Sequence, residues 1–598
     1  MFQRTLLLTK TYALTVLFFL LAKVAFMVCN AEGHAFTASD VLGVLGHGLS
    51  LDLSTALYVL AVPFLCVTAS IFIGWPKLLR WLLNIWFLLA SVGLSLAFVA
   101  DTSLYPFWQF KLDASCLQYL DTPTDAMASV SPGYLILRMA IIILLTAVFF
   151  LAYTLPQPRI KTSRHRIAEA LSALVCIPLI VIGIRGGVDE STTNIGQVYF
   201  SQNQFLNHSA VNPVFSFLSS FEKTASENAT YNFYSKEELA QLTNGLFDSQ
   251  TLPGDTLLTT QRPNVVVVLL ESCGKMFLEV MPNLCKAAEE GVDFTNCFGN
   301  SYRTDRGTVS ALSGYLSFPT MSVMKMSNKV AHLSAIARSL QREGYSTEYL
   351  YGGDINFTKM KGYLISTGFQ QLHWKQDYTI EEQQTANWGV RDDITFKTLG
   401  ELVQRHRDGK PFLIGFSTLS SHEPWDVPVN KFSEKQFNGF WYVDQCIGRF
   451  LADMKSSPVW DNLLIVFMPD HSSDFREFDE QHPDRNRIPM VWTGGAVRQP
   501  RRLDMICNQS DFAATLLGQM GISHADFTFS RDVTSKSYRY PFATHMFNNG
   551  ISMTDSTGFT LYDLTAERVT VTTSAQSERM ARTARAILQL ASEDLSCK

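Results

Sequence analysis

The chain has 598 residues, of which 47% are hydrophobic, and its formal net charge at neutral pH is −5. This length allows several domains, at about 100 to 200 residues each. The slightly acidic balance, without a basic patch that carries interleaved aromatic residues, argues against nucleic acid as a partner.

The front third of the chain contains apolar stretches that are long enough to cross a bilayer as helices, which takes ~20 residues. These stretches lie at residues 5–28, 54–75, 81–100, 134–154 and 168–185. We interpret the first as a retained anchor rather than a signal peptide, because its apolar run is long, no A-x-A-like site follows it cleanly and further spans come after it. The sequence therefore predicts a transmembrane domain of five helices over residues 1–186.

Positive charges predict the orientation of these spans, because short loops rich in Lys and Arg stay in the cytoplasm. Basic residues occur at the N-terminus, between spans two and three, and between spans four and five: Arg4, Lys10, Lys77, Arg80, Arg159, Lys161, Arg164 and Arg166. The connection at residues 30–53 has no Lys or Arg, and the one at 101–133 has only Lys111. We therefore expect a bacterial plasma-membrane protein with a cytoplasmic N-terminus. Everything after about residue 187 then lies on the outer face, in the periplasm or outside a single-membrane cell.

Residues 187–261 are polar, with many Asn, Ser and Thr. This composition predicts an extracytoplasmic linker that lies along the membrane or wraps the domain that follows. The ten cysteines of the chain show no paired metal-ligand spacing. Cys285 and Cys297 either form a disulfide in an oxidising compartment or remain buried thiols, and the sequence leaves both possibilities open.

From residue 262 to 598 the pattern becomes that of an α/β domain. Val265–Leu270 is a run of β-branched and leucine residues, as expected of a strand that is buried on both faces. Similar runs follow at Thr347–Tyr351, Phe412–Ser417, Leu463–Met468 and Pro489–Trp492. Between them, Leu333–Glu343 and Phe440–Lys455 have helical periodicity. Strands that alternate with helices predict a mostly parallel sheet covered by helices on both faces.

Reactive side chains follow four of these predicted strands. They are Glu271 after the first, Asp354 after the second, His422 after the third and the pair Asp470-His471 after the fourth. A single acid at a strand end often caps the next helix, but open α/β sheets bind ligands beyond the carboxyl ends of their strands. Four such ends in one sheet favour a common site, and we interpret the adjacent Asp470 and His471 as ligands of a metal.

Thr304 is the candidate nucleophile of this site. It lies between Arg303 and Arg306, just before the helix-like segment Thr308–Leu312. A hydroxyl at a helix N-terminus faces the positive end of the peptide dipoles, and a divalent cation lowers the pKa of a coordinated hydroxyl much further. The two arginines could neutralise phosphoryl oxygens as charge builds in the transition state. The alternative interpretation is that Thr304 caps the helix and that the arginines are surface charges.

Together these residues resemble the alkaline phosphatase superfamily and, within it, the membrane-anchored lipoteichoic acid synthase family of phosphoglycerol transferases. The resemblance is carried by Glu271-Ser272, Arg303-Thr304-Asp305-Arg306-Gly307, Ser421-His422-Glu423-Pro424, Pro469-Asp470-His471 and Ser510-Asp511. It implies a sulfatase-like fold and one metal, usually manganese, held by the residues Glu271, Thr304, Asp470 and His471. It also implies a covalent intermediate on the threonine, and a contact between His422 and the phosphoglycerol group.

The chain departs from this family at one substrate-binding segment. Members that make lipoteichoic acid carry Phe-Trp-Asn-Arg there, whereas this chain reads Phe357-Thr358-Lys359-Met360. Lys359 is a candidate replacement for the missing positive charge, and Asp354 and His482 are further candidates for substrate binding, although His482 fits a loop residue equally well. The Cys- or Ser-x-Pro-x-Arg signature of sulfatases is absent around Thr304, and an unmodified threonine suits phosphoryl transfer better.

The sequence therefore predicts a metal-dependent transferase that moves a phospholipid head group, of the phosphoglycerol type, through a phospho-threonine to an envelope glycolipid or glycan. The expected donor is phosphatidylglycerol or phosphatidylethanolamine, since a phosphoethanolamine transferase shares the anchor and the threonine. A hydrolase of phosphodiesters or sulfate esters is a further alternative. Oxygen-rich ligands suit Mn²⁺ or Mg²⁺, and Zn²⁺ tolerates them, so we favour Mn²⁺.

Overall fold

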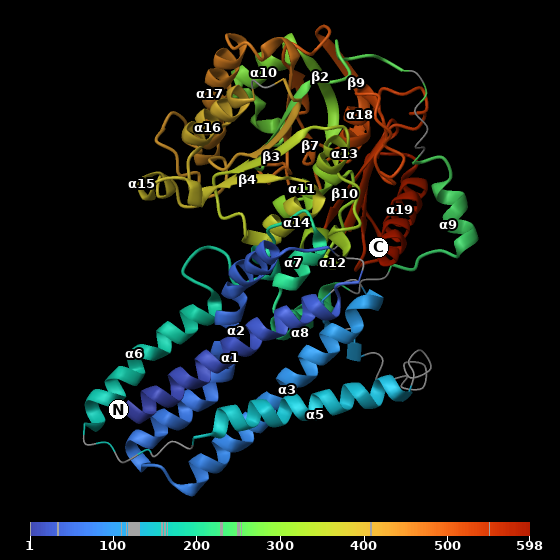
Figure 1. Cartoon of the computed structure of the whole chain (residues 1–598). Coiled ribbons are helices and arrows are strands. Elements are labelled where there is room, and N and C mark those ends of the chain that lie inside the picture. The colour runs from blue at the N-terminus through green and yellow to red at the C-terminus, as the bar shows by residue number, and fades with distance from the viewer. Residues whose placement is uncertain are drawn as a thin grey trace. The chain divides into compact units, whose positions relative to one another are not determined.

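The computed structural model describes residues 2–32, 35–108, 111–114, 116–117, 132–156, 160, 163, 165–227, 231–247, 252, 254–406, 409–548 and 550–598. Arg159, Lys161 and Arg164, which helped to predict the orientation of the spans, lie outside the described residues. The chain forms two compact units, Met1–Glu227 and Asn228–Lys598, and each is described by itself (Figure 1). The division falls inside the segment predicted as a linker.

Among its described residues, the first unit has five helices that are long and apolar enough to cross a membrane, which confirms the predicted number of spans. They are α1 (Phe2–Cys29), α2 (Ala38–Ile73), α3 (Lys77–Trp108), α5 (Pro132–Thr154) and α6 (Arg166–Arg185). Helix α2 begins well before the predicted residue 54, because Thr37 and Asp40 form a capping box at its start. The protein is therefore a membrane protein whose second span is longer than its apolar stretch.

A buried ion pair explains how the polar start of α2 enters the bundle. Lys23 Nζ of α1 lies 2.7 Å from Asp52 Oδ2 of α2, and both side chains are buried. Asn212, between the short helices α7 (Gln204–Ala210) and α8 (Pro213–Glu227), donates a hydrogen bond of 2.8 Å to the same carboxylate. Charges inside a bundle persist when they are paired. Part of the predicted linker thus folds together with the spans.

The second unit is built on a nine-stranded sheet in the order β4-β3-β5-β1-β6-β8-β2-β7, with β9 paired to β2. The strands are β1 (Asn264–Leu270), β2 (Val292–Phe298), β3 (Ser346–Tyr351), β4 (Gln371–Trp374), β5 (Phe412–Ser417), β6 (Leu463–Pro469), β7 (Arg487–Ile488), β8 (Val491–Thr493) and β9 (Arg501–Asn508). Strands β7 and β8 run antiparallel to their neighbours, and the other pairs are parallel. The predicted mostly parallel sheet is confirmed, although the strand expected at Pro489–Trp492 is a short antiparallel one.

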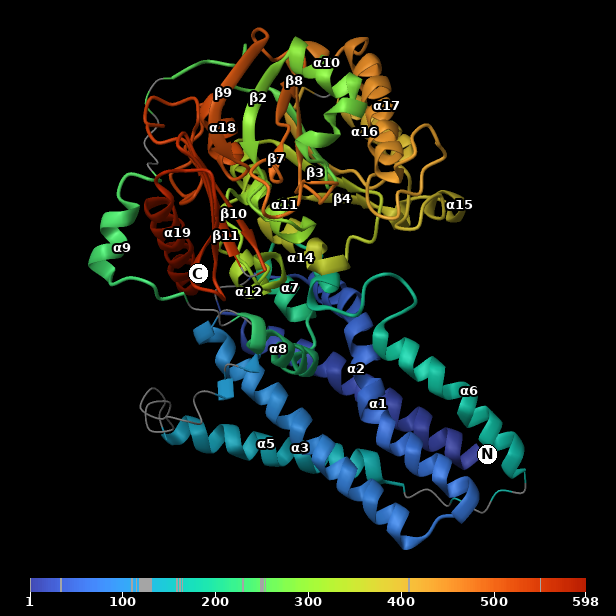
Figure 2. The ribbon, with the colours of Figure 1, turned by 180° about the vertical axis from the view of Figure 1, so that it is seen from behind.

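Helices cover both faces of this sheet (Figures 1 and 2). In β1, Val265, Val267 and Leu269 belong to one buried cluster and Val266, Val268 and Leu270 to the other, as alternation along a strand requires. The first cluster includes residues of α11 (Thr304–Ser313), α13 (Ile336–Arg342), α14 (Met360–Thr367), α18 (Asp511–Gln519) and α19 (Ser577–Cys597). The second includes residues of α10 (Pro282–Glu290), α16 (Asp392–Arg405) and α17 (Lys435–Lys455).

A second, antiparallel sheet follows near the C-terminus. Its strands are β10 (Phe542–Phe547), β11 (Gly550–Asp555), β12 (Gly558–Asp563) and β13 (Arg568–Thr572). The remaining short elements are η2 (Ile195–Val198), α9 (Lys236–Thr243), η3 (Lys275–Val280), η4 (Val323–Lys325), α12 (Ser327–Val330), η5 (Phe357–Lys359), η6 (Lys375–Asp377), α15 (Ile380–Gln383) and η7 (Trp460–Asn462). The amide of Met546 in β10 donates to the carbonyl of Asn300, at 2.9 Å. This sheet therefore supports the segment that leads to Thr304.

Candidate active site

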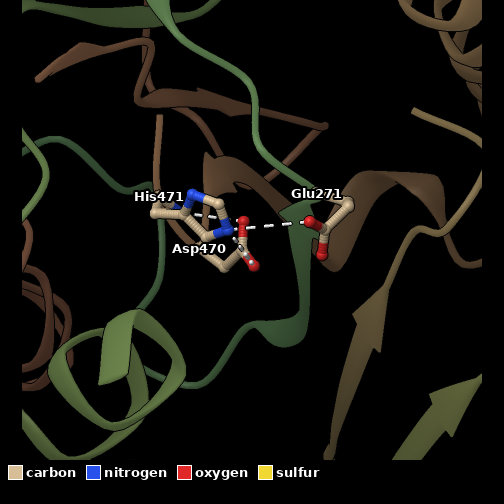
Figure 3. A group of neighbouring side chains, drawn as sticks. All are labelled: Glu271, Asp470 and His471. Carbon is tan, nitrogen blue, oxygen red and sulfur yellow. Dashed lines mark hydrogen bonds and ion pairs between the residues drawn. The ribbon is translucent and has the colours of Figure 1, made fainter. Parts of the chain in front are cut away.

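Three candidate metal ligands meet at the end of two adjacent strands. Glu271 follows β1, and Asp470 and His471 follow β6; these strands are parallel, with Leu270 opposite Pro469. Because parallel strands end at the same edge of a sheet, the two segments deliver their side chains to one point. The ligand atoms lie within 4.8 Å of one another, and His471 Nε2 is 3.6 Å from both Glu271 Oε1 and Asp470 Oδ2 (Figure 3).

Hydrogen bonds from two serines hold Glu271 and Asp470 in place. The amide of Ser272 donates a hydrogen bond of 2.9 Å to Asp470 Oδ1, and its hydroxyl donates one of 2.7 Å to Glu271 Oε1. Ser272 reaches both with a φ of 57°, which is uncommon outside glycine. The hydroxyl of Ser421, after β5, donates to the Glu271 carbonyl at 2.8 Å. The ligand arrangement is thus fixed by the backbone as well as by packing.

Two further residues hold the site in place and were not predicted from the sequence. Thr418 Oγ1 accepts a hydrogen bond of 2.9 Å from the amide of Glu271. Gln509, which is fully buried, donates from Nε2 to the carbonyls of Pro469 at 2.8 Å and of Asp470 at 2.6 Å. Their position next to motif residues was the available signal, since Gln509 immediately precedes Ser510-Asp511.

The charges of this cluster fit a divalent cation. Burial and the Glu271 carboxylate raise the pKa of Asp470 to about 7. Burial alone would lower the pKa of His471, but the carboxylates of Asp470 and Glu271 raise it to about 9. Burial raises the pKa of Glu271, but the hydrogen bond with His471 acts in the opposite direction, and the pKa of Glu271 falls to about 2. Asp470 Oδ2 is buried and has no hydrogen-bond partner among the described residues. An imidazolium thus supplies the positive charge that a bound cation would supply to the same carboxylates.

Thr304 lies beside this cluster. It is the first residue of α11, and its hydroxyl donates a hydrogen bond of 3.3 Å to Glu271 Oε2. The helix lies close to the loop that carries the candidate metal ligands Asp470 and His471, which we call the metal loop. A Cβ atom on Gly307 would lie 1.7 Å from the carbonyl oxygen of Asp470. The glycine therefore allows the N-terminus of α11, with its positive dipole end, to lie against the ligands.

The sulfatase family model matches residues 263–522. The second unit is a sulfatase-like domain. Among solved structures, it is similar to a protein in the alkaline phosphatase superfamily from Vibrio parahaemolyticus. That likeness has a TM-score of 0.54 and 25% sequence identity, and it covers 62% of this chain and 98% of the other.

Two relatives of known name each match part of the chain. Lipoteichoic acid synthase 2 of Bacillus subtilis (strain 168) is 23% identical over 46% of this chain and 48% of its own length. Phosphoglycerol transferase I of Xanthomonas axonopodis pv. citri (strain 306) is 27% identical over 35% of this chain and 34% of its own. The chain therefore spans about half, or less, of the length of these relatives.

In the sulfatase-like domain, His422 is held by an aromatic neighbour that the sequence analysis did not single out. His422 Nδ1 is 2.7 Å from the carbonyl of Glu423, so Nδ1 carries the proton of that bond and Nε2 is left for other partners. Trp388 donates from Nε1 to the same carbonyl, at 2.8 Å, and its ring lies 4.5 Å from the imidazole. The ring of Phe357 is 5.9 Å from that of Trp388.

The two arginines of the sulfatase-like domain that flank Thr304 differ in their environment. Arg303 is exposed, and its guanidinium lies 5.6 Å from the centre of the Tyr302 ring. Arg306 is buried and donates from Nη1 to the Tyr302 hydroxyl and to the carbonyls of Phe318 and Pro319. Arg306 therefore holds neighbouring backbone in place. A contact of either arginine with a phosphoryl group stays a prediction.

The remaining predicted substrate residues make contacts with other residues of the domain. Asp354 is buried and accepts a hydrogen bond of 3.0 Å from the amide of Asn356. Lys359, with a φ of 64°, donates to the carbonyl of Lys325 at 2.9 Å. His482 accepts a hydrogen bond of 3.1 Å at Nδ1 from the amide of Asp484. Their roles in substrate binding stay predictions.

Proposed function

We propose that this protein is a metal-dependent transferase of phosphorylated head groups, of the phosphoglycerol type, that uses Thr304 as its nucleophile. The observation that carries this proposal is the hydrogen bond of 3.3 Å from the Thr304 hydroxyl to Glu271, at a helix N-terminus beside Asp470 and His471. The similarity to a lipoteichoic acid synthase and to a phosphoglycerol transferase supports a phospholipid as donor and an envelope glycolipid or glycan as acceptor.

Glu271, Asp470 and His471 would hold one divalent cation, and the Thr304 hydroxyl lies next to them. Two carboxylates, one hydroxyl and one imidazole favour Mn²⁺, with Mg²⁺ or Zn²⁺ as alternatives. When bound, the cation lowers the pKa of the hydroxyl beside it and stabilises the negative charge of phosphoryl transfer.

The side chains divide the proton transfers between them. The Thr304 oxygen attacks the donor phosphorus while its proton passes to Glu271, which already accepts its hydrogen bond. The bond from phosphorus to the diacylglycerol oxygen breaks, and that oxygen takes the Nε2 proton of His422, which begins the cycle doubly protonated. In the second half, the acceptor hydroxyl gives its proton to the same nitrogen and attacks phosphorus. Thr304 then leaves and regains its proton from Glu271.

In the proposed orientation, the reaction takes place on the side of the membrane that holds its lipid donor. The five helices of the first unit anchor the chain, and the basic residues between them favour an outer location for the sulfatase-like domain. A donor such as phosphatidylglycerol never leaves the bilayer, so an anchored enzyme meets it at high local concentration. The diacylglycerol that remains also stays in the membrane.

The experiment compares intact masses of the full-length protein in detergent with Mn²⁺ and a mixture of phosphatidylglycerol and phosphatidylethanolamine. Wild type and Thr304→Ser, which keeps a hydroxyl, should each gain the mass of phosphoglycerol, whereas Thr304→Ala should gain nothing. A phosphoethanolamine adduct would replace the phosphoglycerol assignment by its alternative. An adduct on Thr304→Ala, or none on metal-loaded wild type, would overturn the covalent route.

A further inference from the structure

Two buried thiols lie opposite each other on adjacent strands of the sulfatase-like domain. Cys297 of β2 and Cys507 of β9 are partners in the register of this parallel pair. Both are 0% exposed and belong to the same core cluster. Partners on parallel strands project from the same face, and the strands lie about 4.7–4.9 Å apart. A disulfide joins Cα atoms that are about 4.4–6.8 Å apart, so the strand spacing places the Cα atoms of this pair within the range of a disulfide.

We infer that Cys297 and Cys507 form a disulfide that ties β2 to β9. The structure has all ten cysteines as thiols, Cys285 and Cys297 among them. Cys285 Sγ lies against the carbonyl of Leu278, at 3.6 Å, whereas Cys297 faces Cys507. The inference rests on the proposed outer location of the domain, because disulfides persist in oxidising compartments.

The bond would lie directly below the active site. One residue beyond the thiols, Phe298 accepts a hydrogen bond of 2.8 Å at its carbonyl from the amide of Gln509. The Asn300 side chain then donates to Asn508, and Gln509 donates to the Asp470 carbonyl. Strand β2 continues into the segment that carries Thr304, and β9 ends one residue before Gln509, which holds the metal loop. A covalent link between them fixes the distance between these two segments.

The oxidation balances with a disulfide donor, such as oxidised glutathione or the disulfide of an envelope oxidoreductase. One thiolate of the pair attacks the donor disulfide and releases the first donor thiolate. The second then attacks the mixed disulfide and releases the other, so two electrons and two protons pass to the donor. Burial, together with the neighbouring Cys507, raises the pKa of Cys297 well above its usual value. Exchange therefore takes place while the strands assemble and not in the closed core.

The test maps the thiols of full-length protein taken from its membrane. The protein is extracted in excess N-ethylmaleimide, denatured, digested without reduction and analysed by mass spectrometry. The peptides of Cys297 and Cys507 should be joined, and those of Cys273 and Cys446, which are equally buried thiols, should carry maleimide. Maleimide on both Cys297 and Cys507 would overturn the inference. The map does not depend on turnover, so it separates this inference from the proposed transfer.

A matched variant tests the mechanical role of the bond. In Cys507→Ser, Cys297 should carry maleimide. A phosphine reductant that is present during heating reaches the bond as the strands part. It should lower the melting temperature of wild type and leave that of Cys507→Ser unchanged, because opening the link returns conformational freedom to the unfolded chain. A wild type that contains the joined peptides but melts at the same temperature with and without reductant would contradict the role as a tie.

Discussion

Single residues outside the motifs hold the metal loop in position. Gln509 is the clearest case, because its amide side chain donates to two consecutive carbonyls, those of Pro469 and Asp470, inside the core. A buried carbonyl that loses its partner costs about 1–3 kcal/mol. The residue therefore contributes both to the stability of the domain and to the geometry of the site.

Gln509→Leu should lower the free energy of unfolding by about 2–4 kcal/mol and also weaken the binding of Mn²⁺, because the loop that carries Asp470 loses both bonds. Urea unfolding and calorimetric titration measure these two effects. Gln519→Leu is the control, since Gln519 donates to Asp255 and Thr534 away from the cluster. It should lower stability and leave the affinity for Mn²⁺ unchanged. Equal affinities in the two variants would contradict the role of Gln509.

The sequence could predict the candidate metal ligands but not the residues that hold them in place. Glu271, Asp470 and His471 follow strands that are buried on both faces, so the apolar run of each strand indicates where the site residue lies. The structure does bring these three side chains together. Gln509 and Trp388 have no such local signal. Their partners lie 39 and 35 residues away along the chain, and only the tertiary fold selects them.

At the scale of elements, helix α11 owes its position to a glycine. Gly307→Ala would put a Cβ atom 1.7 Å from the Asp470 carbonyl oxygen, so the helix must move away from the metal loop. Overpacking of this kind costs about 1–3 kcal/mol, and the shift also moves Thr304 from Glu271. We expect a lower melting temperature and at least a tenfold loss of turnover, about 1.4 kcal/mol in transition-state free energy.

Gly400→Ala in α16 is the matched control for this change. The added Cβ atom would meet only the end of the Met454 side chain, at 3.5 Å, which is an ordinary contact. Alanine also favours a helix over glycine by about 1 kcal/mol. Stability should therefore rise slightly and turnover should stay the same. Wild-type activity in Gly307→Ala would show that the close approach of α11 is not needed.

The edge strand β4 and its neighbour β3 meet at a buried carboxylate that makes stability depend on pH. Glu348 is 2.7 Å from His373 Nε2, from His406 Nε2 and from Arg405 Nη2. Burial opposes ionisation, but these neighbours lower the pKa of Glu348 below its usual value. A depressed folded-state pKa adds stability above the unfolded value, about 4.3, and this stability is lost as the pH falls through the folded-state pKa.

The unfolding free energy of wild type should therefore fall more steeply below about pH 4 than that of Glu348→Gln, which has no carboxylate to protonate. Urea unfolding of both proteins over a series of acidic buffers measures the two slopes. Glu434→Gln is the control, because Glu434 pairs with Arg476 on the surface and a surface pair contributes little. Parallel slopes for wild type and Glu348→Gln would contradict the prediction.

The elements themselves divide into those that the sequence predicts and those that it does not. Strands β1, β5 and β6 have unbroken apolar runs because neighbouring strands and helices on both faces bury them. Strand β9 carries Arg501, Arg502 and Asp504 and is partly exposed, so its sequence pattern is typical of a loop. Only its pairing with β2 makes it a strand. The antiparallel sheet β10–β13 was not predicted either, because in strands such as β10 and β11 polar residues and glycine interrupt the apolar ones, although most of both strands is buried.

For the whole molecule, the orientation in the membrane decides which substrates the sulfatase-like domain meets. Cys597, in the last helix, is exposed. A membrane-impermeant maleimide should label it in intact spheroplasts, because the proposed topology puts the domain outside. Peptide mapping identifies the site, and Cys597→Ser should remove that adduct. Cys176, within the fifth span, should stay unlabelled. Labelling of Cys597 only after lysis would reverse the proposed orientation.

The order of the sheet separates neighbours in space by long stretches of chain. Strand β1 ends at residue 270, whereas its partners β5 and β6 begin at residues 412 and 463. During translation, β1 is made before both of its neighbouring strands, and pairing between strands that are far apart in the sequence is slow. An unfinished chain is already anchored by its first helices and carries Thr304, but it lacks Asp470 and His471. In the proposed mechanism, a stalled or truncated product therefore remains in the bilayer without attacking the lipids around it.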